Sequence, residues 1–404
     1  MKVLVLDAAS AQALAAVRSL GSRGIHVAAA DSIKWAKSFL SRFCGEAFAY
    51  TSPAVDINAF AREVQALLRA RPYDVLLPMS DRTLLPISLR RAEISPLVKA
   101  LPLPPHEAIE VTQNKEKTLS LAQSLHVPVP ATTCPDDLAQ LEEMADACLY
   151  PVVIKPRASY RVEGDQLISG GRPQYAFNRE EFITKYKAVH HRSPFPLVQE
   201  FVPGVGFGVF ALMNHGKLRA LFGHQRLREM FPTGSGSSYR ASVPVDPYMR
   251  DYALRLLEAL NWHGVAMVEF KKDLRDGIPK LMEINGRFWG SLPLAIAAGV
   301  DFPYLLCRMM LEGDIEEVVT YRIGVRCRWL VGDFVHLGEV LKGPPPGWPG
   351  PFPRRAETLR DFCYLFGRDL YYDDFQFCDV KPFFAEVLDY ASRRLPRFWR
   401  KQHG

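Results

Sequence analysis

The sequence predicts an α/β protein whose N-terminal part is a doubly wound parallel sheet. The segments Met1–Leu6, Ile25–Ala30 and Val75–Pro78 are apolar and have the length of buried strands. A predicted helix lies between each pair of strands. The first has Leu14, Val17 and Leu20 on one face, and the second covers Pro53–Ala70. Strands that alternate with helices in this way are typical of a parallel sheet with helices on both faces.

Aspartates follow the predicted strands. Asp7, Asp31 and Asp81 stand just beyond strand ends, where open parallel sheets bind ligands, so they are candidates for a small-molecule site. The alternative, in which each caps the next helix, stays open and is at least as good for Asp81. The first turn reads Asp7-Ala8-Ala9-Ser10 and lacks G-x-G-x-x-G, which argues against a dinucleotide site.

The rest of the chain continues the alternation with longer strands. A proline-rich linker after residue 100 precedes a helix that opens at Lys115. Further helices are expected at Asp136–Cys148, Arg179–His190 and Pro247–Leu260, and strands at Tyr150–Pro156, Gln166–Ile168, Leu197–Val202, on both sides of the turn Asn214–Gly216, at Val265–Lys272, Lys280–Asn285 and Val325–Val331. A Pro/Gly run at Gly343–Gly350 and a terminal helical stretch follow.

Composition excludes several classes of protein. The chain has 404 residues with 50 basic and 44 acidic side chains, too weakly basic for a dedicated nucleic-acid binder. Its seven cysteines form no C-x-x-C pair and its ten histidines no H-x-x-x-H pair, so neither a disulfide framework nor zinc is expected. No apolar run approaches the roughly 18 residues of a membrane span, and no signal peptide is evident. We therefore expect a cytoplasmic protein.

The C-terminal tail, residues 391–404, carries five basic side chains and no acidic one, interleaved with Phe398 and Trp399. Weak peripheral contact with an anionic membrane is one interpretation of this composition. A solvated helix end is the favoured alternative.

The most informative segment is a predicted hairpin with two glutamates. Glu269 and Glu283 lie seven residues on either side of Asp276, in a turn-rich linker, so we expect them to face each other across two strands. Two neighbouring carboxylates on apolar strands stay ionised only with a cation between them. The alternative is a solvent-exposed hairpin face with ordinary surface glutamates.

The residues beside this pair define the expected chemistry. Asn285 shares a face with Glu283, and oxygen ligands of this kind suit Mg²⁺ or Mn²⁺, which keep open positions for phosphate. Arg287, further along that face, would meet the remaining negative charge. Lys155 ends an apolar strand and Lys115 opens a helix, so both are expected to meet an anion. Together these residues predict a nucleoside triphosphate site.

The set formed by Lys115, YPVVIKP, VQEFVPG, GVAMVEF and LMEINGRF resembles the ATP-grasp superfamily over roughly residues 1–315. The motif order is similar to that of the branch with biotin carboxylase and carbamoyl-phosphate synthase, and most similar to bacterial ATP-dependent carboxylate–amine ligases. The resemblance implies an ATP-grasp fold preceded by a doubly wound (pre-ATP-grasp) domain and followed by a C-terminal α+β extension. The implied domains are residues 1–108, 109–198 with a lid, 199–315 and 316–404.

The resemblance also implies roles for individual residues. Lys115 and Lys155 would hold phosphates, and the hinge Gln199, Glu200, Phe201 and Val202 would bind adenine. Glu269, Glu283 and Asn285 would bind Mg²⁺ (or Mn²⁺), and Arg287 and Arg226 would stabilise the transferred phosphoryl group. Asp81, Trp289 and Ser291 are expected near the substrates. The stretch Arg157-Ala158-Ser159-Tyr160-Arg161 replaces the family's glycine-rich flap, and its arginines would cover phosphates instead. The loop Thr233–Ser238 is either a substrate flap or a plain surface loop.

The activity expected from this resemblance is an ATP- and Mg²⁺-dependent ligase. It would activate a small-molecule carboxylate as an acyl phosphate and join it to an amine, releasing ADP and phosphate. A carboxylase or carbamoyl-phosphate type that acts on bicarbonate, and a non-catalytic ATP-binding protein, remain as alternatives. The expected partners are the two small substrates and a second copy in a homodimer, with no nucleic acid.

Overall fold

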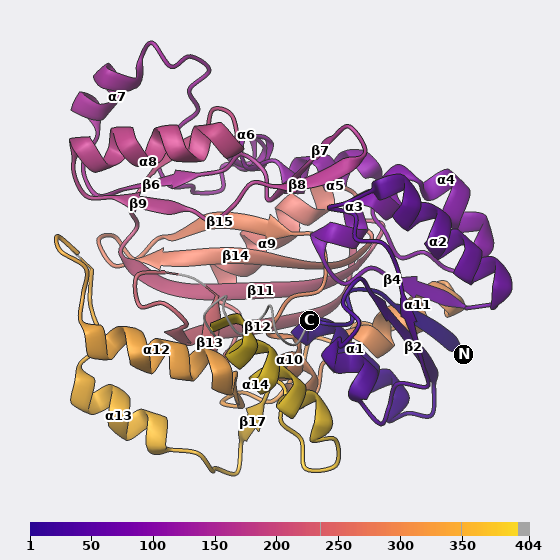
Figure 1. The fold of residues 1–404 in the computed structure, drawn as a ribbon. Helices are drawn as coiled ribbons and strands as arrows, with labels where there is room; N and C mark the ends of the chain where they lie inside the picture. The colour runs from indigo at the N-terminus through magenta and orange to yellow at the C-terminus, as the bar shows by residue number, and fades with distance from the viewer. Residues whose placement is uncertain (235, 349, 395–404) are drawn as a thin grey trace, which may run out of the picture.

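The computed structural model describes residues 1–404 apart from 235, 349 and 395–404. This part of the chain forms four sheets: a parallel N-terminal sheet of four strands, an antiparallel sheet of four strands, a seven-stranded sheet through the middle and a two-stranded hairpin. In Figure 1 the N-terminal domain lies at the right, the antiparallel four-stranded sheet at the upper left and the C-terminal module at the lower left. The mixed α/β class predicted from the sequence is confirmed.

The N-terminal sheet has the order β3-β2-β1-β4, and all neighbouring strands are parallel. Val3 and Val5 pack against α1, whereas Leu4 and Leu6 pack against α2 on the opposite face. The elements are β1 (Lys2–Val5), α1 (Ala11–Gly21), β2 (His26–Asp31), η1 (Lys37–Leu40), β3 (Glu46–Ala49), α2 (Ile57–Ala70), β4 (Val75–Leu77), α3 (Asp81–Leu89), α4 (Arg91–Ile94) and η2 (Ser95–Leu97). The sequence did not predict β3, because this edge strand has only four residues and is partly exposed.

The four-stranded sheet, with order β5-β10-β6-β9, is called here the lid sheet. One face packs on α7 and α8 through Val152, Ile154 and Val198, so the alternate residues face the cleft. The elements of this region are α5 (His106–Gln113), α6 (Lys115–Ser124), β5 (Thr132–Thr133), α7 (Leu141–Ala147), β6 (Val152–Lys155), β7 (Tyr160–Glu163), β8 (Gln166–Ser169), β9 (Gln174–Ala176), α8 (Arg179–Arg192) and β10 (Leu197–Glu200).

The seven-stranded sheet, with order β15-β14-β11-β12-β13-β16-β17, is called here the main sheet. Its face with Val268 and Phe270 packs on α9, and its face with Val265 and Met267 shares a core with the N-terminal domain. The elements are β11 (Gly204–Asn214), β12 (Lys217–Glu229), β13 (Ser237–Ser242), α9 (Pro247–Ala259), β14 (Gly264–Asp273), β15 (Pro279–Asn285), α10 (Leu292–Ala298) and α11 (Phe302–Glu312).

The C-terminal module adds two short strands to this sheet and wraps beneath it (Figure 1). Its elements are β16 (Arg326–Arg328), α12 (Leu330–Lys342), α13 (Arg355–Cys363), β17 (Leu370–Tyr372) and α14 (Lys381–Arg394). The strand expected over Val325–Val331 is shorter, because the buried Arg328 binds Asp333 and the chain turns at Trp329 into α12. The basic tail singled out in the sequence lies mostly outside the described residues.

No single helix in the described ranges is both long and apolar enough to cross a membrane. Within these ranges, only the pair α10 and α11 has the combined length and apolar composition of a membrane span, and the axes of the two helices differ by 82°.

Candidate active site

The glutamate hairpin forms as the sequence predicts. Glu269 of β14 lies directly opposite Glu283 of β15. From the turn to Phe270–Leu281 the strands pair in one register, which would bring Met282 opposite Glu269 if it continued. A β-bulge at this point adds one residue to β15 and brings Glu283 into place instead. The predicted pairing is therefore confirmed, but it depends on a bulge that counting from the turn did not anticipate.

The bulge also sorts the side chains of β15. Leu281 and Ile284 both pack into the core with α9, although they are three residues apart. Glu283 and Asn285 consequently face the cavities on the other side. Without the extra residue a strict alternation could not place both apolar residues in the core.

Each of the two carboxylates has a partner within the protein, an arginine for Glu269 and an asparagine amide for Glu283. Arg226 of β12 lies 2.5 Å from Glu269, and Asn285 Nδ2 donates to Glu283 at 3.0 Å. Burial raises the pKa of Glu269, and the negative charge of Glu283 adds to this despite Arg226. Burial also acts on Glu283, but Lys115, the Asn285 hydrogen bond and Lys155 outweigh it and hold its pKa below the ordinary value. Glu283 is therefore the carboxylate most strongly held in its ionised form.

Arg287 and Asp81 extend this network toward the N-terminal domain. Arg287 Nη2 donates to Asn285 Oδ1 at 2.7 Å, and its Nε donates to Asp81 Oδ2 at 3.1 Å. Gln113 donates to the other Asp81 oxygen at 2.6 Å. Asp81 thus orients Arg287. It borders a small cavity together with Lys115 and Glu283, and it does not border the larger cavity of about 780 Å³ described below.

Both predicted lysines lie near the carboxylates. Lys155, at the end of β6, sits on the cleft face of the lid sheet, where Glu283 is its strongest charged neighbour. Burial lowers its pKa to about 8, and the positive charge of Lys115 adds to the effect. Lys115 is the first residue of α6, whose cap Asn114 accepts hydrogen bonds from two backbone amides. A helix N-terminus and two lysines beside two carboxylates suit a phosphate chain with a divalent cation.

Arg157 does not cover this site, so the expectation that it replaces a phosphate flap is wrong. Its guanidinium forms an ion pair with Glu116 and donates to the carbonyls of Phe195 and Pro135. The backbone carbonyl of Arg157 accepts from Lys115 N at 2.8 Å. The residue therefore ties the lid sheet to the start of α6.

The hinge residues occupy the end of β10. Gln199 is buried and donates to Thr132 Oγ1 at 2.9 Å, but no partner in the described residues reaches its Oε1. Glu200 pairs with Arg275 at 2.7 Å and Lys280 at 2.9 Å, which joins the hinge to the turn of the glutamate hairpin. Phe201 and the buried Val202 follow immediately. Roles for these four residues in adenine binding remain predictions.

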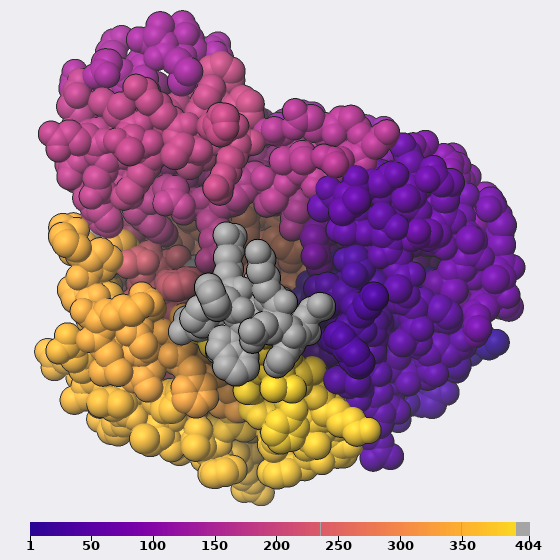
Figure 2. All heavy atoms as spheres, viewed as in Figure 1, coloured from indigo at the N-terminus to yellow at the C-terminus, as the bar shows by residue number. Residues whose placement is uncertain are grey.

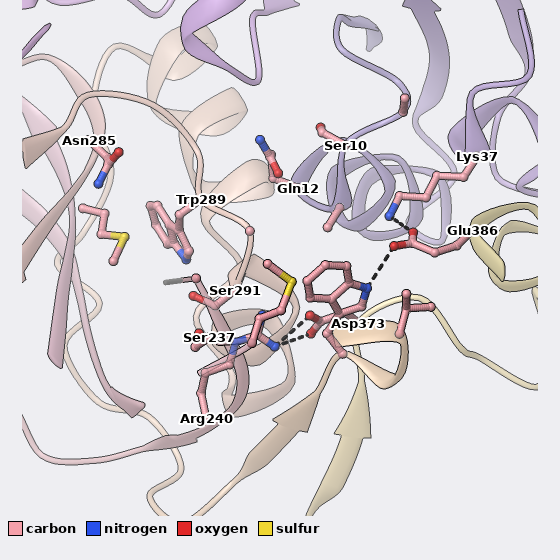
Figure 3. A pocket seen from close by; sticks show the side chains of 18 of the residues that line it. Ser10, Gln12, Lys37, Ser237, Arg240, Asn285, Trp289, Ser291, Asp373 and Glu386 are labelled. Atoms are coloured by element: carbon pink, nitrogen blue, oxygen red, sulfur yellow. Dashed lines mark hydrogen bonds and ion pairs between the residues drawn. The ribbon is translucent and has the colours of Figure 1, made fainter. Parts of the chain in front are cut away.

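Below the carboxylates lies a cavity of about 780 Å³, called here the acceptor cavity. Figure 2 shows the N-terminal domain, the lid region and the C-terminal module arranged around the centre of one face of the molecule. The predicted residues Glu269, Glu283, Asn285, Arg287, Arg226, Trp289 and Ser291 all border the cavity. Figure 3 shows Trp289 and Ser291 on one wall and Ser10 and Gln12, from the start of α1, on the opposite wall.

The third wall comes from the C-terminal module and was not anticipated. Trp329, Asp373, Glu386 and Tyr390 line the same cavity as the hairpin glutamates. These residues lie between 60 and 121 positions after Glu269, and no spacing rule connects them to it. An isolated cluster of Asp, Trp and Tyr in the C-terminal part carries no signal that would have marked it as part of the site.

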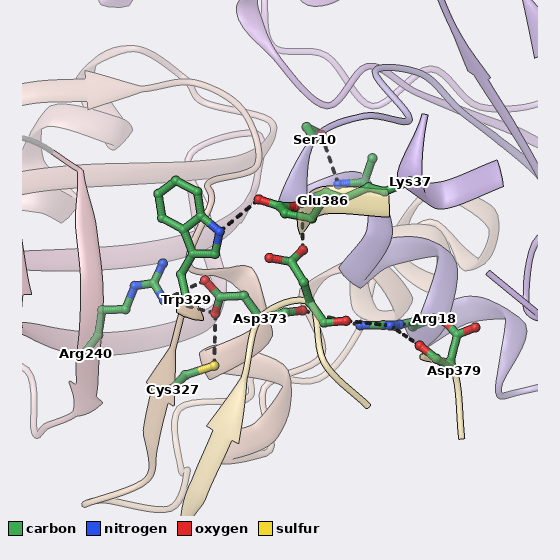
Figure 4. Close-up of polar contacts among 11 residues, drawn as sticks. Ser10, Arg18, Lys37, Arg240, Cys327, Trp329, Asp373, Asp379 and Glu386 are labelled. Atoms are coloured by element: carbon green, nitrogen blue, oxygen red, sulfur yellow. Dashed lines mark hydrogen bonds and ion pairs between the residues drawn. The ribbon is translucent and has the colours of Figure 1, made fainter. Parts of the chain in front are cut away.

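Buried ion pairs fix this wall to the N-terminal domain (Figure 4). Lys37 of η1 pairs with Asp374 at 2.7 Å and with Glu386 of α14, and Trp329 Nε1 donates to Glu386 at 2.9 Å. Arg18 of α1 donates to Asp379 at 2.8 Å. These contacts are called here the clamp.

Two of the N-terminal aspartates do not line the site, contrary to expectation. Asp7 and Asp31 are almost completely buried. Asp7 accepts from Thr83 Oγ1 and Met79 N, and Asp31 accepts from Ala9 N, so both order the loops at the strand ends. Burial raises the pKa of Asp7 to about 6.

The described residues contain no group of three His, Cys, Asp or Glu side chains arranged to hold a metal by themselves. The set Glu269, Glu283 and Asn285 supplies two carboxylates and one amide oxygen, and Arg226 already contacts one carboxylate. Such a set fits a Mg²⁺ that is completed by substrate phosphates and water, and it does not form a self-sufficient metal cage.

Comparison with known proteins identifies this arrangement. Residues 192–332, which include the hinge and the glutamate hairpin, match a family described as "ATP-grasp in the biosynthetic pathway with Ter operon". The chain has an ATP-grasp fold. The ATP-grasp fold also accounts for the order of the lid sheet, hinge and main sheet.

Solved ATP-grasp structures share this fold at low sequence identity. The biotin carboxylase domain of 2-oxoglutarate carboxylase from Hydrogenobacter thermophilus, in complex with MgADP, ADP and bicarbonate, has a TM-score of 0.62 and 16% identity, over 80% of this chain and 73% of that one. L-amino acid ligase from Bacillus licheniformis has a TM-score of 0.60 and 18% identity, over 78% of this chain and 75% of that one.

Among curated relatives, the carbamoyl phosphate synthase large chain of Methanosphaerula palustris is 25% identical over 302 residues. The match covers 72% of this chain and 27% of that protein. The corresponding Archaeoglobus fulgidus protein is 23% identical over 52% of this chain and 20% of its own length. The chain therefore spans about a quarter or less of the length of these relatives.

Proposed function

We propose that this ATP-grasp protein is an ATP- and Mg²⁺-dependent carboxylate–amine ligase. The observation that carries the proposal is the position of Glu269 and Glu283 between two sites. Glu283 borders both a small cavity with Lys115 and the acceptor cavity, and Lys115 and Lys155 are its positively charged neighbours. A phosphoryl donor and a carboxylate acceptor would then meet at the hairpin.

The comparisons support a reaction of this type. One structural neighbour is an L-amino acid ligase, and another was crystallised with MgADP and bicarbonate. The acceptor cavity, at about 780 Å³, is much larger than bicarbonate requires. Its size and its aromatic walls, which include Trp289 and Trp329, favour a larger organic substrate.

In the proposed reaction the γ-phosphoryl group of ATP passes to a carboxylate oxygen, and ADP is released. The nitrogen of an amine then attacks the acyl carbon, the carbon–oxygen bond to phosphate breaks, and the amine gives up a proton. Mg²⁺ held by Glu269, Glu283 and Asn285 would neutralise phosphate charge. Arg287, oriented by Asp81, would bind the acyl phosphate oxygens from the cavity side.

Arg226 would change its binding partner during this reaction. In the structure its guanidinium lies against Glu269. When the nucleotide brings its own cation, that contact must weaken, and Arg226 can then bind the transferred phosphoryl group. Arg226 therefore exchanges one anionic partner for another, which limits the cost of burying the two glutamates in the absence of nucleotide.

The decisive experiment measures ADP and phosphate release with ATP, Mg²⁺ and panels of carboxylates and amines, with mass spectrometry of the product. Turnover that requires both a carboxylate and an amine supports the ligase. Glu283→Gln should lower the rate about a hundredfold or more, because the charge that holds the cation is lost. Glu163→Gln, an exposed carboxylate of β7, is the matched control and should leave the rate unchanged.

Other outcomes separate the alternatives. Phosphate release with bicarbonate alone would favour a carboxylase or carbamoyl-phosphate type of activity. Tight nucleotide binding without turnover on any substrate would favour a non-catalytic protein. Near-normal turnover by Glu283→Gln would contradict the assignment of the metal site.

A homodimer is proposed by analogy with the biotin carboxylase domain, which was crystallised as a dimer, and analytical ultracentrifugation tests it.

A further inference from the structure

Trp348, from the Pro/Gly run of the C-terminal module, packs against the lid sheet and hinge. Its indole lies 5.2 Å from the Phe201 ring and 5.9 Å from the Tyr175 ring, measured between centroids. Phe177 is a third aromatic neighbour at 6.1 Å. A residue nearly 150 positions after the hinge thus belongs to the same aromatic cluster as the hinge itself.

The lid-sheet residues in this cluster face the cleft. Thr132, Gln199, Val153 and Tyr175 lie directly opposite one another on β5, β10, β6 and β9 and form one row across the sheet. Lys155 lies two residues from Val153 and so shares its face. The row therefore runs beside the lysine that we assign to phosphate, toward Trp348 at its outer end.

This row contains an unfilled hydrogen-bond acceptor. Gln199 is 2% exposed, and its Oε1 has no partner among the described residues. A buried amide oxygen without a donor is costly, so the site is suited to a ligand that supplies an N–H group. The exocyclic amino group of adenine is such a donor.

The opposite side of this region is formed by the main sheet. Lys271 of β14 places its ammonium 5.2 Å from the centre of the Phe201 ring. Phe201, Lys271 and Trp348 border a cavity of about 860 Å³ that also reaches Arg226. The cavity thus connects the aromatic cluster with the arginine beside Glu269.

We propose that Trp348 is a nucleotide-binding residue that forms the outer wall of the base pocket. The inference rests on the proposed function, since it assumes that an adenine nucleotide occupies the cleft. All three ring neighbours of Trp348 are edge-on, at 72° to 78°, so no described ring stacks in parallel on the indole. A planar base is a suitable partner for that face.

The loop around Trp348 holds the indole in position. Its backbone N–H donates to Pro345 O at 3.1 Å, and Nε1 donates to Pro351 O at 3.4 Å. Both polar groups are therefore satisfied within the loop, and the ring does not need a hydrogen bond from the cleft. The C-terminal module would in this way contribute to both the base pocket and the acceptor cavity.

The test compares two probes, Mg-ADP and inorganic tripolyphosphate, by calorimetry on the full chain. Trp348→Ala should weaken ADP binding about tenfold or more, because stacking on one base is lost. It should leave tripolyphosphate binding unchanged, because the phosphate groups lie at Lys115 and Lys155. Trp348→Phe should restore part of the ADP affinity. Phe366→Ala, an exposed aromatic of the same module, is the matched control.

The outcomes are distinct. Unchanged ADP affinity in Trp348→Ala would overturn the inference, and tighter binding would show that the indole obstructs the pocket instead. Equal losses for ADP and tripolyphosphate would also overturn it, because the effect would then not concern the base. If the unaltered protein binds no adenine nucleotide at all, the proposed function itself fails.

Discussion

At the scale of single residues, the site depends on how buried charges are balanced before any ligand arrives. Lys155 shows this most clearly. Burial lowers its pKa to about 8 from an ordinary value near 10.5, although Glu283 opposes the shift. A phosphate beside this lysine would raise its pKa again, because a nearby negative charge stabilises the ammonium form. Nucleotide binding is then coupled to the uptake of a proton at alkaline pH.

We therefore predict that nucleotide affinity is constant below pH 8 and falls by about tenfold per pH unit above it, toward pH 10. Lys155→Met should bind more weakly at pH 7 and should lose this contribution to the pH dependence. Calorimetric titration with ADP from pH 7 to 9.5 measures both. An equal slope in the variant would show that another group carries the effect.

The stability of the ligand-free protein should change in the opposite direction. The folded-state pKa of Lys155 lies below its unfolded value, so the unfolded chain binds more protons between pH 8 and about 10. This lysine consequently makes the free energy of unfolding rise across that interval. At pH 7, Lys155→Met should be more thermostable than the unaltered protein, although it binds nucleotide less well.

At the scale of elements, α6 and the glutamate hairpin place groups that the sequence had marked. The hairpin could be predicted because its two glutamates and its turn are close in sequence. The bulge could not, since it reflects how Leu281 and Ile284 both reach the core. For α6, the sequence predicted the helix start at Lys115, and the structure shows that Asn114 caps it by accepting from Glu116 N and Lys117 N.

Removing this cap should affect both stability and function. Asn114→Ala should cost about 1 kcal/mol of unfolding free energy and should also weaken nucleotide binding, because Lys115 begins the helix. Asn178 caps α8 in the same way, on the side of the lid sheet away from the cleft. Asn178→Ala is the matched control, with a similar loss in urea unfolding and an unchanged affinity for ADP. Equal effects of the two variants on affinity would exclude a local role for α6.

At the scale of the whole molecule, the C-terminal module is what sequence reasoning left without a role. The ATP-grasp fold and the residues at the hairpin could be predicted because each motif is local. The ion pairs of the clamp, such as Arg18–Asp379, join residues more than 300 positions apart, and no local sequence pattern predicts them. The third wall of the acceptor cavity follows from these distant contacts.

Breaking the clamp should therefore alter both stability and substrate binding. Arg18→Met leaves the buried Asp379 without its strongest partner, and we expect a loss of about 3–5 kcal/mol. Hydrogen exchange of α14 should accelerate, and the KM for the acceptor substrate should rise because Glu386 and Tyr390 line its cavity. Arg308→Met, which breaks an exposed helical pair, is the control and should leave stability almost unchanged. Unchanged exchange of α14 in Arg18→Met would contradict this role of the clamp.

The two short strands β16 and β17 have a practical consequence for protein engineering. They cover the open edge of β13, and only β16 contacts it directly. A shortened form that stops near residue 315 would leave the backbone amides and carbonyls of β13 unsatisfied and available to other chains. Such a fragment would precipitate or form oligomers by edge-to-edge strand pairing, even though every residue of the glutamate hairpin would still be present.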